Sequence, residues 1–160
     1  MECFYPNLKP GSYGPADITG VLSMKKNLKV SFIYLLAGLA AGVFFREFTK
    51  FNHFDGMTAL GTVHTHLLVL GMAVFLLLAL FEQSLTLSAS KKWKPFLAVY
   101  NIGLVIAAIM MLIKGVLQVQ GQTSTAMIAG IAGAGHILIA IGFILLFLIL
   151  LERVSVKEKS

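Results

Sequence analysis

The sequence contains one cysteine, Cys3, which excludes an internal disulfide and a cysteine-based metal site. Charged residues make up only 12% of the 160 residues, against roughly 25% in ordinary soluble domains. Proline is scarce as well: there are four, and three of them precede residue 16. Little in the rest of the chain would interrupt a helix, and any bound metal must be held by histidine, methionine or carboxylate.

Hydrophobic residues, by contrast, make up 58% of the chain and are gathered in four long runs. Each run is close to or above the ~20 residues that a helix needs to cross the hydrocarbon of a bilayer. The runs also leave no room for a soluble domain of the usual size. We therefore predict an all-α fold with one domain of four transmembrane helices, at residues 30–48, 57–81, 95–118 and 125–151.

The flanking segments divide the chain into three parts. Residues 1–23 hold three prolines and three glycines without a regular apolar pattern, which predicts an irregular or disordered arm. Met24 then resembles a second start, so we expect 1–23 to be an extension before a membrane domain at 24–155 and a tail at 156–160. An alternative is a signal peptide cleaved after the small residues 37–41. The apolar run continues beyond that point, which favours a retained helix.

Basic residues are concentrated on one side of the predicted bilayer. Three lie between the second and third runs and three follow the fourth, whereas the loop at 120–125 has no charge. The excess of positive charge on cytoplasmic loops then predicts a bacterial plasma-membrane protein with both termini in the cytoplasm. The net charge of +6 is accordingly assigned to topology and anionic lipid, and nucleic acid is not an expected partner.

Three of the four histidines, His64, His66 and His136, fall inside predicted crossings, and the first two lie on the order of 10 Å from the outer face. Ionisable groups in a bilayer are costly and mark a site, a relay or a packed hydrogen bond. The simplest explanation for one such histidine is a bond to a neighbouring helix. His53, which lies with Asp55 in an outer loop, is expected to be solvated.

The spacing of His64 and His66 is the most informative feature of the sequence. Residues two apart on an α-helix point about 200° apart, so these imidazoles cannot share one metal from one unbroken helix. We expect each to face a different site, with the other ligand coming from another helix or another copy of the chain. Haem iron suits imidazole ligands in apolar surroundings, and no cysteine or carboxylate cluster competes.

Residues 61–72, GTVHTHLLVLGM, resemble the His-x-His helix of the catalytic subunit of haem-copper oxidases and nitric oxide reductases. In that family the two histidines serve two haems. The family's subunit is similar to three four-helix arcs around a pseudo-threefold axis, and this chain has the length of one arc. The chain also resembles small bacterial cytochrome-c-oxidase-like proteins over most of residues 24–155. The resemblance implies a homotrimer.

The resemblance is incomplete where copper is concerned. The oxidases' copper site needs a histidine pair, and no His-His sequence occurs here. An oxygen-reducing binuclear centre is therefore not expected, although copper itself is left open. His136, among small residues, is a candidate axial ligand or distal group. Arg46 and Lys114 are candidates to bind haem propionates, with headgroup contact as the alternative, and Met72 is a candidate soft ligand.

The leading hypothesis is a haem-b protein in which His64 of one chain and His66 of the next hold each haem iron. It would act in electron transfer, redox sensing or the binding of small gases such as NO and O2, with oxidase-like or reductase-like activity undecided. The second hypothesis is a transporter or channel for protons, metal ions or an anion, lined by His64, His66, His136 and Lys114. The third is a structural or assembly subunit with packed histidines.

Overall fold

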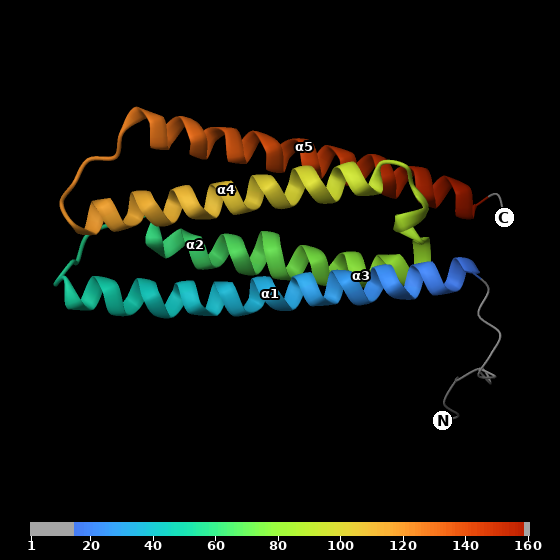
Figure 1. The fold of residues 1–160 in the computed structure, drawn as a ribbon, viewed down its shortest axis with the longest axis horizontal. Coiled ribbons are helices and arrows are strands. Elements are labelled where there is room, and N and C mark those ends of the chain that lie inside the picture. Colours follow the sequence, from blue (N-terminus) through green and yellow to red (C-terminus); the bar gives the residue numbers. More distant parts are fainter. Residues whose placement is uncertain (1–14, 159–160) are drawn as a thin grey trace, which may run out of the picture.

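The structure, a computed structural model, describes residues 15–158, and every long element in that range is a helix (Figure 1). The first crossing is α1 (Pro15–Phe51). The second is a continuous helix made of three segments: α2 (Leu60–His66), the π-helix η1 (Leu67–Ala73) and α3 (Val74–Leu85). A short 3-10 turn, η2 (Leu87–Ala89), leads to α4 (Trp93–Val119), and α5 (Ala126–Lys157) follows. Consecutive crossings run side by side in opposite directions.

Four helices in the described range are long and apolar enough to cross a membrane. The prediction of an all-α chain with four such helices is thereby confirmed. The crossings pack mainly with their neighbours in sequence, α1 on the second crossing, the second crossing on α4, and α4 on α5. The result is a row of helices in which α1 and α5 form the two edges (Figure 1).

Most helix ends extend beyond the predicted apolar runs, although the second crossing begins at Leu60 and not at 57, and α5 begins one residue late. The helix α1 departs most from the prediction, at its start. It begins at Pro15, so residues 15–23, which were expected to be irregular, are helical; residues 1–14 of that predicted arm lie outside the described range. Proline is well tolerated in a first helical turn, where its missing N–H has no partner to lose. The added turns are stabilised by packing, since Ser23 and Asn27 are buried.

The two ends of the row differ in their side chains. The end where α1 and α4 begin and α3 and α5 finish carries most of the described lysines, and we call it the basic end. There Lys92 pairs with Glu152, and the Arg153 side chain donates to the Leu85 carbonyl over 3.0 Å. The opposite end, where α2 and α5 begin, is called the histidine end.

Close contact between α4 and α5 depends on glycine. A Cβ atom added at Gly103 would lie 2.7 Å from the Leu138 Cβ atom and 2.8 Å from the Ile139 backbone nitrogen. Small residues that let backbones approach are a general feature of helix packing in membranes, where apolar burial alone gives no attraction between helices. Nearer the histidine end, an added Cβ at Gly130 or Gly133 meets no atom within 4 Å.

Substituting Gly103 by alanine should therefore destabilise the protein, because the clash is with the backbone of α5 and cannot be relieved by a rotamer change. We expect a loss of about 1–3 kcal/mol in the free energy of unfolding, measured as a lower midpoint of thermal unfolding in detergent. Gly130→Ala is the matched control and should be neutral or slightly stabilising. Equal midpoints for the two variants would contradict the packing.

Candidate functional site

The backbone of the second crossing changes form directly after the histidines. His66 is the last residue of α2, and the π-helix η1 begins at Leu67. π-Helical turns are rare and are frequently found at functional sites. Hydroxyl groups from both neighbouring helices bond its carbonyls: Ser31 of α1 donates to Met72 O over 2.8 Å, and Tyr100 of α4 donates to Leu70 O over 2.8 Å. These bonds fix the helix that presents His66.

His66 and His136 are brought together from α2 and α5. Their ring centroids lie 5.9 Å apart with the ring planes at 83°. The Nδ1 atom of His66 lies 3.0 Å from the Thr62 carbonyl oxygen, and that of His136 lies 2.8 Å from the Ala132 carbonyl oxygen. We call these two residues the histidine pair.

The hydrogen bonds of the histidine pair determine which nitrogen is free. A carbonyl oxygen only accepts, so each Nδ1 must carry the proton that it donates. In a neutral imidazole the Nε2 atom then has its lone pair available. An Nδ1–H bonded to a backbone carbonyl is also the usual support for a histidine that binds a metal through Nε2. Both members of the histidine pair are thus prepared as ligands.

His64 lies on the other side of α2, as the spacing predicted. Its ring stacks with Phe45 of α1, with centroids 6.4 Å apart and planes at 15°. A Cβ added at Gly42 would contact its side chain at 3.7 Å. The Nδ1 atom of His64 is buried and has no hydrogen-bond partner within the described residues. The structure therefore does not bring His64 to the histidine pair.

The two cations that the sequence suggested as propionate ligands, Arg46 and Lys114, lie on different helices, α1 and α4. Arg46 follows Phe45 on α1, on the His64 side, and its exposed side chain is 3.8 Å from Glu47. Lys114 is half-buried, and no ion pair involves it among the residues that the structure describes. It follows Met111 by three residues, so the two share one side of α4. Lys114 therefore lies on the same side of α4 as Met111, whereas Arg46 lies on α1.

Other sequence candidates lie elsewhere. Met72 is in η1 and packs against the core. The methionine near the histidine pair is instead Met111, whose sulfur lies 3.7 Å from the Thr62 hydroxyl one turn before His66. His53 is exposed in the α1–α2 loop, and no group of three or more metal-binding side chains occurs among those of residues 20–158.

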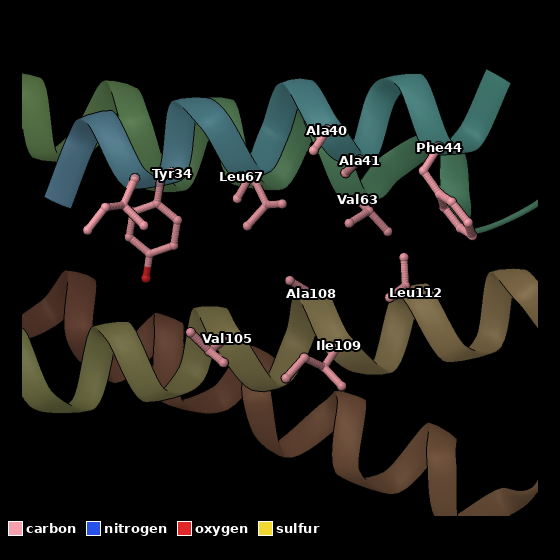
Figure 2. A pocket seen from close by; sticks show the side chains of 12 residues that line it. Tyr34, Ala40, Ala41, Phe44, Val63, Leu67, Val105, Ala108, Ile109 and Leu112 are labelled. Atoms are coloured by element: carbon pink, nitrogen blue, oxygen red, sulfur yellow. The ribbon is translucent and has the colours of Figure 1, made fainter. Parts of the chain in front are cut away.

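An apolar hollow of about 530 Å³ lies between α1, α2 and α4. Figure 2 shows Ala41 and Phe44 facing Ile109 and Leu112 across it. No histidine lines this hollow. Its polar atom, the Tyr34 hydroxyl, donates to the Asn101 side chain over 2.7 Å. The hollow is suited to hydrocarbon and offers no reactive group.

Sequence reasoning missed a polar stripe on α1. Ser23, Asn27 and Ser31 are buried, with 8%, 3% and 6% of their surfaces exposed. They are four residues apart and so share one face of the helix. That spacing was visible in the sequence, and it could have predicted that this face of α1 is turned to the protein.

The comparisons with known proteins give a family but no activity. Residues 24–153 match the family described as protein of unknown function (DUF2871). Neither a curated protein nor a solved structure matches the chain. The matched range contains His64, His66, His136 and Lys114.

The support for η1 can be tested with a matched pair of serine variants. Ser31→Ala removes the part-buried hydroxyl that bonds the Met72 carbonyl of another helix, whereas Ser155→Ala removes an exposed hydroxyl that bonds Leu151 O of its own helix. We expect Ser31→Ala to be less stable than Ser155→Ala by about 1 kcal/mol. Thermal unfolding in detergent measures the difference, and identical midpoints would contradict the role of this bond.

Proposed function

The chain belongs to the family of unknown function DUF2871, and we propose that it is a membrane protein that binds haem b through the histidine pair. One observation carries the proposal. Two imidazoles from two helices lie 5.9 Å apart, and each has its Nδ1 atom bonded to a carbonyl. Two imidazoles on opposite sides of one metal ion need ring centres roughly 6 Å apart, with metal–nitrogen distances near 2 Å.

The surroundings of the histidine pair suit a porphyrin. The first turns of α5 are mostly exposed, and Gly130 and Gly133 face open space, so nothing in the described residues covers this side. Lys114 is half-buried and forms no ion pair with any residue that the structure describes. A haem propionate would supply its counter-charge. His66, His136 and Lys114 are the residues that would hold the group.

The proposed function is electron transfer. Bound haem supplies a one-electron couple at iron, and two histidine ligands leave no open position for a gas. Electron transfer therefore fits the histidine pair better than gas binding does. We propose this ligand set in place of His64 of one chain and His66 of the next, because His136 of the same chain already faces His66. The homotrimer in the plasma membrane stays a prediction.

The transport path is less well supported by the geometry. A path for ions needs its polar groups in one continuous series, but His64 stacks against α1 while His66 faces α5. The body of α2 stands between them. A transporter would also be colourless, so one measurement separates the two functions.

The ligands can be identified by absorption spectra of the full chain, expressed with added haem and purified in detergent. The wild-type protein should show a Soret band and, after dithionite reduction, sharp α and β bands. His66→Ala and His136→Ala should each lower the haem content at least tenfold or abolish the six-coordinate spectrum. His64→Ala is the control in the same crossing and should keep it.

Two outcomes would overturn this assignment. A colourless wild-type protein after adequate haem supply would exclude haem. Loss of the spectrum in His64→Ala, with His136→Ala unchanged, would replace the histidine pair by a haem shared between chains.

Lys114 gives a separate prediction because it would act on the propionates and not on iron. Lys114→Gln should lower haem affinity about tenfold through loss of a charge-assisted bond, with band positions unchanged. Lys50→Gln, also at the histidine end but exposed, is the control and should bind haem normally. Haem titration monitored at the Soret band measures both affinities. Equal affinities would show that Lys114 does not contact the haem.

A further inference from the structure

A second pocket lies at the basic end, far from the histidines. It has a volume of about 310 Å³ and is formed by residues 22–27 of α1, by η2 and by the start of α4. Its polar lining comes from Ser23, Lys26, Asn27, Ser88 and Lys94, with Trp93 beside them. No part of the proposed haem site contributes to it.

Asn27 gives this pocket a buried hydrogen-bond donor without a partner in the described part of the chain. The residue is buried, with 3% of its surface exposed, and it lines the cavity. The Nδ2 amide nitrogen has no hydrogen-bond acceptor among the described residues. Buried donors in proteins are nearly always bonded. The amide is therefore available to a ligand that brings an acceptor.

The charge of the pocket fits an anion. Lys26 and Lys94 line it, and neither forms an ion pair with the side chains of residues 20–158. The nearest buried carboxylate, Glu82, already accepts bonds from the backbone nitrogen and the hydroxyl of Ser88. Glu152 is paired with Lys92. The groups left for a ligand are two ammonium donors and one amide donor.

We propose that this pocket binds a phosphate group, and that the source is the headgroup of an anionic phospholipid. A phosphate has enough acceptor oxygens for all three donors and carries the charge that two lysines attract. Basic pockets between transmembrane helices are typical sites for anionic headgroups. Trp93 is of the residue type that gathers at the membrane surface, and Leu22 and Leu97 in the wall would contact the acyl chains.

The test compares two double variants that remove the same charge. Lys26→Gln with Lys94→Gln alters the pocket, whereas Lys29→Gln with Lys91→Gln alters exposed lysines of the same end that do not line it. The full chain is assembled in nanodiscs of phosphatidylcholine with spin-labelled phosphatidylglycerol, and lipid affinity is measured by electron paramagnetic resonance. We expect the pocket variant to lose affinity about tenfold and the control less than twofold.

Two further measurements distinguish a lipid headgroup from a soluble phosphate, and a loss of binding from a folding defect. Asn27→Leu removes the amide donor at similar side-chain size without adding a charge, and it should lower phosphatidylglycerol affinity without lowering the midpoint of thermal unfolding in pure phosphatidylcholine, because the amide that it removes is buried and unbonded. Inorganic phosphate is then titrated into the wild-type nanodiscs. No displacement of the labelled lipid supports the lipid headgroup, and displacement supports a soluble phosphate compound in the same pocket.

Two results would overturn the site. Equal losses in the two double variants would mean that the basic end attracts anionic lipid only through its overall charge. Absence of any preference for phosphatidylglycerol over phosphatidylcholine, together with no binding of inorganic phosphate, would mean that the pocket takes no phosphate group. Neither result depends on whether the histidine pair binds haem.

Discussion

Backbone groups that are shielded from water must find their hydrogen bonds within the protein, and this constraint governs the centre of the structure. The second crossing departs from α-helical form over Leu67–Ala73. Two of its carbonyls there are bonded by hydroxyl groups from opposite neighbours, Ser31 on α1 and Tyr100 on α4. The same two bonds tie three crossings together at one level. His66 directly precedes this stretch, so its position is set by α1 and α4 as much as by its own helix.

The four crossings could be predicted because apolar length is a local property that can be counted along the chain. The π-helix could not, since it is stabilised by a tyrosine 30 residues further along. The start of α1 was predicted wrongly for a related reason. Ser23 and Asn27 look like surface residues in the sequence, yet contacts of α1 with α3 and η2 bury them and extend the helix.

The candidate site could likewise be predicted only in part. The opposed directions of His64 and His66 follow from helix geometry alone, and the structure has them. The partner of His66 does not follow from it. His136 reaches that level because α5 packs on α4 through Gly103 and Gly135, whose added Cβ atoms would touch backbone of the opposite helix at 2.8 and 2.9 Å. This contact fixes the position of α5 along α4 and its rotation about its own axis. The sequence of neither helix predicts this contact.

The two proposed sites are physically independent, which follows from where each lies on α4. Lys94 and Lys114 are 20 residues apart on one helix, a separation of roughly 30 Å. Effects of substitutions at such distances generally add, because the sites share no partner. The basic end is also tied by the Lys92–Glu152 pair and the Arg153 bond to Leu85, whereas Gly130 and Gly133 of α5 face open space at the histidine end. Uptake of a cofactor beside α5 would thus rearrange the loosely packed end and leave the phosphate pocket in place.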